Sequence, residues 1–215
     1  MTIDKNDLLN SILENIAHID YVKSADIPNI DLYMDQVTSF MEKQFESSKR
    51  YSDDKVLTKT MINNYAKSDL LPAPLKKKYS KEHLLVLTFI YYFKNVLSMK
   101  DIEVLLNPIT ENYFQSEQEI NISYIYDEIC SFEKQHSELI QQDITQMYQN
   151  SLETFTEIED ENRNTLQLFS FICSLCLDVY AKKLLIEKLI DELPAPVSET
   201  TEKEKDKEKK KTEKK

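Results

Sequence analysis

Residues 57–79 read LTKTMINNYAKSDLLPAPLKKKY, and this stretch decides the fold class. Thr58 has the features of a helix N-cap, because an apolar residue precedes it and another follows at the fourth helical position. This pattern predicts a helix at about residues 58–69. Two prolines then exclude a helix over residues 71–79 and favour extended or turn backbone there.

The same cap signal recurs at Ser80 and Ser98, which predicts helices at about 80–96 and 98–106. Apolar residues also repeat at helical spacing in four other segments, which are residues 5–22, 32–45, 120–149 and 164–191. Glycine is absent from all 215 residues. Walker and Rossmann phosphate loops are therefore excluded, and long sheets with tight two-residue hairpins are disfavoured. We expect an all-α chain.

Two long helices are expected in the second half of the chain. The apolar stripe of residues 120–149 alternates steps of three and four, as in a helix that pairs with another helix, and is interrupted at His136. Residues 164–191 form the most hydrophobic segment. Asp178 and scattered polar residues argue against a membrane span there, so we expect a buried central helix. A Lys/Glu-rich tail follows, which we expect to be disordered.

Charge is distributed unevenly along the chain. The formal net charge is −11, but residues 55–83 carry seven lysines and two acids, a balance of +5. Residues 111–161 carry thirteen acids and one lysine, a balance of −12. Such asymmetry gives a polyanion one attractive face, although two solvated helix surfaces would also explain it.

A polar stripe is expected along the helix at 58–69. Thr60, Asn63, Asn64 and Lys67 fall at i, i+3, i+4 and i+7, so they share one surface. Asparagine can pair with adenine through two hydrogen bonds, and lysine can reach guanine or phosphate. Lysines 76–78 follow in the proline-bounded loop and could neutralise phosphates. A polar helix surface followed by a solvated loop is the alternative.

Two stretches carry a resemblance to known families. Residues 58–65, TKTMINNY, and residues 31–37, DLYMDQV, resemble a bacterial family known only as domain of unknown function eighteen thirty-six. Residues 57–79 are also similar to the recognition helix and wing of the mercury-resistance-regulator (MerR) superfamily. The chain departs from that superfamily at Asn63 and Asn64, which replace an arginine and a tyrosine, and at Asp69, which replaces a turn glycine. Aspartate tolerates the left-handed backbone that such a turn needs.

The MerR resemblance implies a winged helix-turn-helix with additional helices at both ends. The implied organisation is an N-terminal helix (1–27), the winged helix-turn-helix (28–107), a C-terminal helical dimerisation or effector region (108–193) and the tail (194–215). Such a protein would be a homodimer that regulates transcription by placing the helix at 58–69 in the major groove of double-stranded DNA. The expected DNA-binding residues are Lys59, Thr60, Asn63, Asn64, Lys67, Lys76, Lys77, Lys78 and Tyr79.

Other chemistry finds little support in the sequence. Cys173 and Cys176 are one helical turn apart without a second ligand pair, and no catalytic order can be assembled from three scattered histidines. We therefore expect the protein to bind no metal or cofactor and not to be an enzyme. We expect His83 to lie on the surface. Three cysteines and the polar residues near the N-terminus suggest a cytoplasmic protein without a membrane segment. A helical adaptor that binds a basic protein partner is the alternative function.

Overall fold

The computed structural model describes residues 22–158 and 161–193, and it is mostly helical. The expected helix at 5–22 and the tail from 194 lie outside these residues, apart from Val22. The described elements are, in chain order, η1 (Ser24–Asp26), β1 (Leu32–Tyr33), α2 (Met34–Gln44), η2 (Glu46–Ser48), α3 (Lys59–Lys67), β2 (Lys78–Tyr79), α4 (Lys81–Phe93), α5 (Met99–Tyr113), α6 (Ile122–Leu152) and α7 (Glu161–Asp191).

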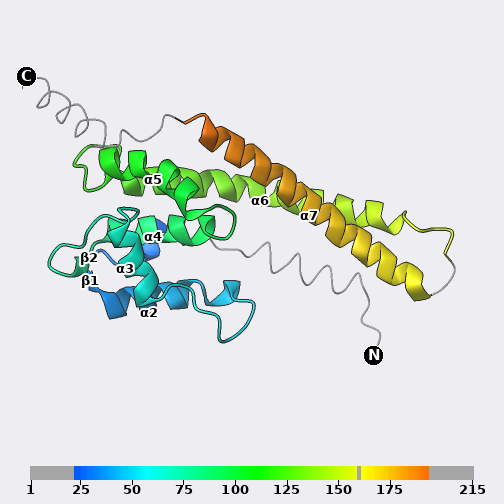
Figure 1. Cartoon of the computed structure of the whole chain (residues 1–215), viewed down its shortest axis with the longest axis horizontal. Helices are drawn as coiled ribbons and strands as arrows, with labels where there is room; N and C mark the ends of the chain where they lie inside the picture. The colour runs from blue at the N-terminus through cyan, green and yellow to red at the C-terminus, as the bar shows by residue number, and fades with distance from the viewer. Residues whose placement is uncertain (1–21, 159–160, 194–215) are drawn as a thin grey trace, which may run out of the picture.

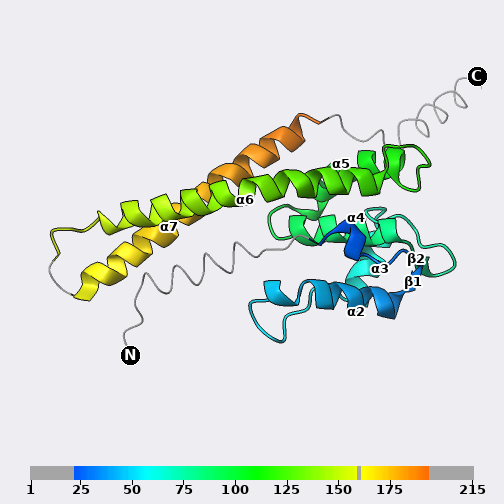
Figure 2. The same cartoon turned by 180° about the vertical axis from the view of Figure 1, so that it is seen from behind.

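Helix α4 is the centre of the molecule. Figures 1 and 2 show α2 and α3 on one side of α4, and α5, α6 and α7 on the other. Every residue from His83 to Ile90 is buried, which a helix achieves only when neighbours surround it. The expectation that residues 164–191 form the buried central helix is therefore wrong. Helix α7 has α6 as its main neighbour and leaves many apolar side chains exposed.

The two longest helices, α6 and α7, form a hairpin that extends beyond the rest of the fold (Figure 1). Two apolar clusters hold it. Near the base, Ile122, Tyr126 and Ile190 belong to the main core. Toward the tip, Tyr148 and Phe171 pack together with ring centroids 5.3 Å apart.

The β-structure of the described residues consists of one small ribbon and an isolated bridge between Leu75 and Lys78. Strands β1 and β2 are antiparallel, with Leu32 opposite Tyr79. Residues 32 and 33, expected to begin a helix, are thus extended, and α2 starts at Met34. The ribbon lies at the end of the molecule remote from the tip of the α6–α7 hairpin (Figures 1 and 2).

Helix α5 begins as expected but ends later than expected. Ser98 Oγ accepts a hydrogen bond from the Asp101 N–H, and the Asp101 carboxylate accepts one from the Ser98 N–H, both at 3.2 Å. The helix then continues through Pro108 to Tyr113. Proline removes one backbone donor and is normally costly inside a helix. Burial of Leu106 and Thr110 on either side of it stabilises the helix here, and the expected boundary at residue 107 falls within α5.

Candidate nucleic-acid interface

Helix α3 is fixed by its cap and by its inner face. The Thr58 Oγ1 accepts a hydrogen bond from the Met61 N–H at 3.2 Å, as the N-cap signal predicts. Ile62 and Tyr65 are buried in the main core, while Met61 is half-buried against it. The orientation of α3 about its own axis is therefore set by apolar packing against the rest of the fold.

The predicted polar stripe lies on the opposite face. Thr60, Asn63, Asn64 and Lys67 are all exposed. Helices α6 and α7 lie across α4 from α3 (Figures 1 and 2). The structure therefore leaves this surface open.

Asp69 ends α3 in the left-handed conformation that the sequence indicated. Its φ is 58°. The chain then turns so that the Leu71 N–H donates to the Tyr65 carbonyl at 3.0 Å, and both Leu70 and Leu71 are buried. A residue with a short polar side chain can thus replace the glycine that often ends a helix.

The next segment is a tight hairpin whose two central residues are lysines. Lys76 and Lys77 have φ values of 51° and 64°, and the Lys78 N–H donates to the Leu75 carbonyl at 2.9 Å across the turn. Both central residues of such a turn are usually Gly, Asn or Asp. This chain therefore makes a two-residue turn without glycine, while the sheet of the described residues stays small, as the absence of glycine predicted.

The expected site residues of the hairpin, Lys76 to Tyr79, separate into exposed or partly exposed lysines and a buried tyrosine. Lys76 and Lys77 are exposed, and the Lys78 ammonium lies 5.3 Å from the centre of the exposed Tyr33 ring. Tyr79 differs, because it is only 3% exposed and belongs to the main core. Tyr79 packs beneath the hairpin and cannot contact a ligand. The expectation that Tyr79 is a DNA-binding residue is therefore wrong.

A cleft of about 310 Å³ lies between α2 and the start of α3. Its lining residues are Thr38, Ser39, Glu42, Lys55, Leu57, Thr58 and Lys59. Lys59, an expected site residue, forms an ion pair with Asp35 at the edge of α2. Sequence reasoning missed Ser39, because only the packing of α2 against α3 brings it to the same cleft as Lys55 and Lys59. The Thr38 hydroxyl donates to the carbonyls of Met34 and Asp35 in its own helix.

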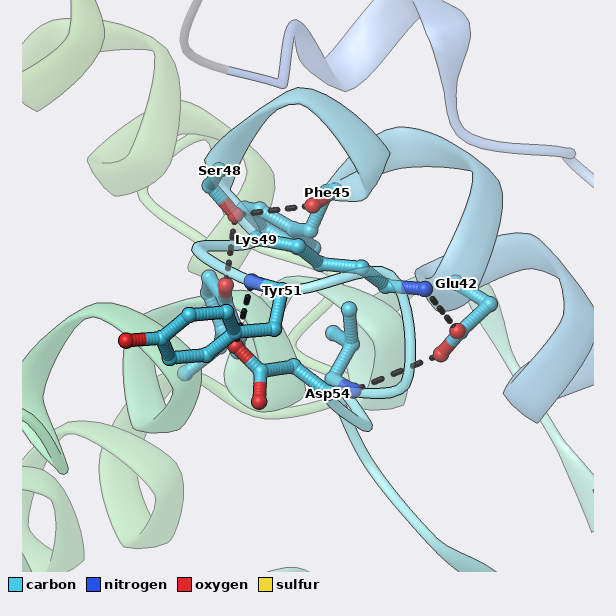
Figure 3. A network of polar contacts seen from close by, with 8 residues as sticks. Glu42, Phe45, Ser48, Lys49, Tyr51 and Asp54 are labelled. Atoms are coloured by element: carbon cyan, nitrogen blue, oxygen red, sulfur yellow. Dashed lines mark hydrogen bonds and ion pairs between the residues drawn. The ribbon is translucent and has the colours of Figure 1, made fainter.

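The segment that joins α2 to α3, residues 45–58, is held by a polar network (Figure 3). The Glu42 carboxylate forms an ion pair with Lys49 and accepts a hydrogen bond from the Val56 N–H at 3.3 Å. The hydrogen bond from Lys49 holds the pKa of Glu42 below its usual value. These contacts fix the first turn of α3 relative to α2.

The same segment is also attached to α4. Ser48 donates to the Phe45 carbonyl at 2.8 Å, and its hydroxyl lies 2.6 Å from that of Tyr91. The Lys94 ammonium donates to the Val56 carbonyl at 2.6 Å and lies 4.7 Å from the centre of the Tyr91 ring. Burial lowers the pKa of Lys94. A helix-turn-helix usually joins its two helices by three or four residues. Residues 45–58 form a longer connection, and the contacts of Ser48 and Lys94 hold it against α4.

His83 lies beneath the hairpin and is not on the surface as expected. It is 1% exposed. Its Nδ1 accepts a hydrogen bond from the Ser80 N–H at 3.0 Å, and its ring packs edge-on against Tyr79 and Phe114. Burial lowers the pKa of His83. The sequence signal was available, since the residue three positions after an N-cap often accepts from the cap's N–H.

Residues 22–158 and 161–193 contain neither a metal-binding cluster nor a membrane-spanning helix. No group of three His, Cys, Asp or Glu side chains there could hold a metal ion. Cys173 is half-buried and Cys176 is exposed. No helix in this part of the chain is long and apolar enough to cross a membrane.

Comparison with known proteins gives one match. No curated protein and no solved structure matches the chain. The model of a family described as a domain of unknown function (DUF1836) matches residues 22–129, which run from the chain's first described residue into α6 and include α3, the hairpin and α4. The match covers half of the chain, and the chain therefore belongs to the DUF1836 family.

Proposed function

We propose that this protein binds double-stranded DNA and regulates transcription, with α3 lying in the major groove. The observation that carries the proposal is the exposed stripe of Thr60, Asn63, Asn64 and Lys67, followed along the chain by the lysine hairpin. The B-DNA major groove is about 12 Å wide and admits one α-helix. The proposal takes the MerR-type winged helix-turn-helix as the nearest comparison for how α3 and the hairpin would dock.

Base recognition is assigned to the middle of the stripe. Asn63 and Asn64 each offer one amide donor and one acceptor, which match N7 and N6 of adenine. Both lie on an ordered helix whose opposite face, at Ile62 and Tyr65, is packed into the core. A rigid support of this kind limits the entropy lost when the side chains meet a base edge.

Phosphate contacts are assigned to lysines on both sides of the stripe. Lys76 and Lys77 project from the hairpin, and Lys55 and Lys59 line the cleft at the start of α3. In that cleft the exposed hydroxyl of Ser39 could donate to a phosphate, and the N-terminus of α3 favours negative charge. The carboxylate of Glu42 faces the same cleft but is already neutralised by Lys49.

The uneven charge determines which side of the protein would face DNA. The basic segment, residues 55–83, includes α3 and the hairpin, whereas the acidic segment, residues 111–161, includes all of α6, which lies across α4 from α3 (Figure 1). A polyanion is attracted to one side of such a molecule and repelled from the other. This arrangement explains how a chain of net charge −11 could bind DNA.

A dimer would let two copies of α3 read two half-sites, and we assign its interface to α7. Phe169, Ile172 and Tyr180 recur at helical spacing, and all three are exposed. Leu184, one helical turn after Tyr180 and 42% exposed, continues this apolar face toward the end of the helix. Exposed apolar patches of this extent commonly mark protein interfaces.

Selection from a random pool of duplexes tests the proposal. The full-length chain is incubated with the pool at about 50 mM and about 200 mM salt, and bound duplexes are sequenced. We expect an A-containing motif to be enriched, with much weaker binding at the higher salt. No enrichment at either salt would contradict the proposal.

The same chain can separate DNA binding from the adaptor function. A lysate treated with nuclease removes nucleic acid before capture on the immobilised protein. Loss of all captured partners under nuclease supports DNA binding. Retention of a basic protein partner by the wild-type chain, together with no duplex enrichment, would favour the adaptor instead.

A further inference from the structure

Helix α6 carries an apolar seam that no described residue covers. Ile129, Phe132 and Leu139 are 43%, 57% and 56% exposed, and His136 lies between the last two. The steps of three, four and three residues place all four on one face of the helix. The rings of Phe132 and His136 lie 4.5 Å apart, which shows that the seam is continuous.

The seam lies between the two clusters that hold the α6–α7 hairpin. Ile122 and Tyr126 are buried in the main core, and Tyr148 is buried against Phe171. The intervening part of α6 therefore has no apolar partner among the described residues on this face. This is the middle of the stripe whose spacing predicts pairing with another helix.

The described chain begins at the start of this seam. The Tyr126 hydroxyl donates a hydrogen bond to the Val22 carbonyl, and Val22 is buried. Two residues later, Ser24 Oγ donates to the Asp127 carboxylate at 2.8 Å. Residues 1–21 therefore connect to the fold beside Tyr126.

Apolar residues before Val22 have the same spacing as the seam residues after Tyr126, but in the opposite chain direction. Counting back from Val22, the apolar residues Ile19, Ile16, Ile12 and Leu9 lie three, six, ten and thirteen positions away. Counting forward from Tyr126, the seam residues Ile129, Phe132, His136 and Leu139 lie at the same four distances. Two antiparallel helices have the same rise of about 1.5 Å per residue, so equal steps keep such pairs opposite one another.

We propose that residues 8–19 form a helix that packs antiparallel on the α6 seam of the same chain. The bond between Tyr126 and Val22 sets the register, so that Ile19 lies beside Ile129, Ile16 beside Phe132 and Leu9 beside Leu139. The segment from 8 to 19 and the seam from 129 to 140 would each be about 17 Å long. Attachment beside the seam gives the segment a high effective concentration there, which favours it over a second copy of the chain.

Hydrogen exchange of the full-length chain tests this packing. Peptides that cover residues 8–19 are followed by mass spectrometry in the wild type and in the Phe132→Asp and Leu139→Asp variants. Ser131→Asp is the matched control, because Ser131 is exposed on α6 about 100° around the helix from Phe132. Exchange of residues 83–90 in α4 reports whether each variant has kept its fold.

We expect residues 8–19 of the wild type to exchange at least about tenfold more slowly than an unstructured peptide. Both seam variants should restore fast exchange of residues 8–19, while Ser131→Asp and the α4 peptides should not change. Fast exchange in the wild type would overturn the proposal. Protection that survives Phe132→Asp, or that disappears on dilution, would also overturn it, because the segment would then lie elsewhere or be covered by a second copy.

Discussion

The backbone N–H of Ser80 donates a hydrogen bond to Nδ1 of His83, with 3.0 Å between the two nitrogens. An imidazole nitrogen accepts a hydrogen bond only when it carries no proton. The first turn of α4 therefore requires a neutral His83. The same ring packs against Tyr79, the buried residue that follows the lysine hairpin, so one residue links the cap of α4 to the proposed DNA-binding surface.

The stability of the fold should fall when the pH drops below about 6.5, the ordinary pKa of histidine. Burial lowers the pKa of His83 in the folded chain, so the unfolded chain binds more protons below that pH and is favoured. In the His83→Gln variant the side-chain oxygen can still accept from the Ser80 N–H, but nothing titrates at this position. Urea unfolding should be measured from about pH 7.5 down to about pH 5. Over this range the free energy of unfolding should fall less for His83→Gln than for the wild type.

Glu82 also titrates differently in the folded and unfolded chain, so the pH dependence of stability must be compared between the wild type and His83→Gln. Burial raises the pKa of Glu82, so its folded form binds more protons in mildly acidic solution and opposes the effect of His83. Both proteins contain Glu82, and its contribution cancels in their difference. Identical pH profiles for the two proteins would show that His83 is not the titrating group.

Replacing the two central hairpin lysines by the residues that the turn prefers should stabilise the fold. Lys76→Asn with Lys77→Gly relieves two left-handed lysines, each costing roughly 1–2 kcal/mol, while glycine costs roughly 0.5–1 kcal/mol in entropy. We expect the free energy of unfolding to rise by about 1 kcal/mol. The affinity for DNA should fall in the same variant, because two phosphate contacts are lost. If the variant is less stable than the wild type, the left-handed lysines do not strain the turn. If its affinity for DNA is unchanged, Lys76 and Lys77 do not contact phosphates.

Removing the Lys94 ammonium should loosen the attachment of residues 45–58. Lys94→Met leaves the Val56 carbonyl without this donor, at an expected cost of about 1–2 kcal/mol in the free energy of unfolding. Lys100→Met is the matched control, because Lys100 is exposed at the start of α5. It should stay within about 0.5 kcal/mol of the wild type. Equal stabilities for the two variants would show that the Lys94 contact contributes nothing.

The two faces of α3 should respond differently to truncation. Ile62 is fully buried, so Ile62→Ala should cost about 2–5 kcal/mol of stability. Asn63 is exposed, so Asn63→Ala should change stability by less than about 0.5 kcal/mol. On the selected duplex, Asn63→Ala should weaken binding by about 1–3 kcal/mol and relax the base preference at one position. Loss of affinity without a change in preference would reassign Asn63 to a phosphate.

Local signals allowed much of the fold to be predicted. Thr58 and Ser98 cap helices as their sequence neighbours indicate, and Asp69 takes the left-handed backbone. These features depend on residues within one helical turn of each other, which a sequence displays directly. The exposure of Asn63 and Lys67 follows for the same reason, because helical periodicity places them on the side of α3 that faces away from the buried pair Ile62 and Tyr65.

Features that depend on distant residues could not be predicted. The pairing of Leu32 with Tyr79 joins segments far apart in the chain, and it buries a tyrosine that looked like part of the surface. The turn at Lys76 and Lys77 breaks the usual residue preference, so propensity pointed away from it. By contrast, the burial of α4 was available from the sequence, because residues 84–93 carry no charged side chain, whereas α7 includes Asp178 and Lys182.

The salt dependence of duplex binding tests the central claim most directly. The affinity of the wild type and of a Lys76→Gln, Lys77→Gln variant is measured on the selected duplex from about 50 to 200 mM salt. The logarithm of the binding constant should fall with the logarithm of salt, and each lost phosphate contact should reduce the slope by about 0.9. We predict a variant slope shallower by about 1.8, with the fold intact. Equal slopes, or wild-type binding that does not depend on salt, would contradict a hairpin that lies on the DNA backbone.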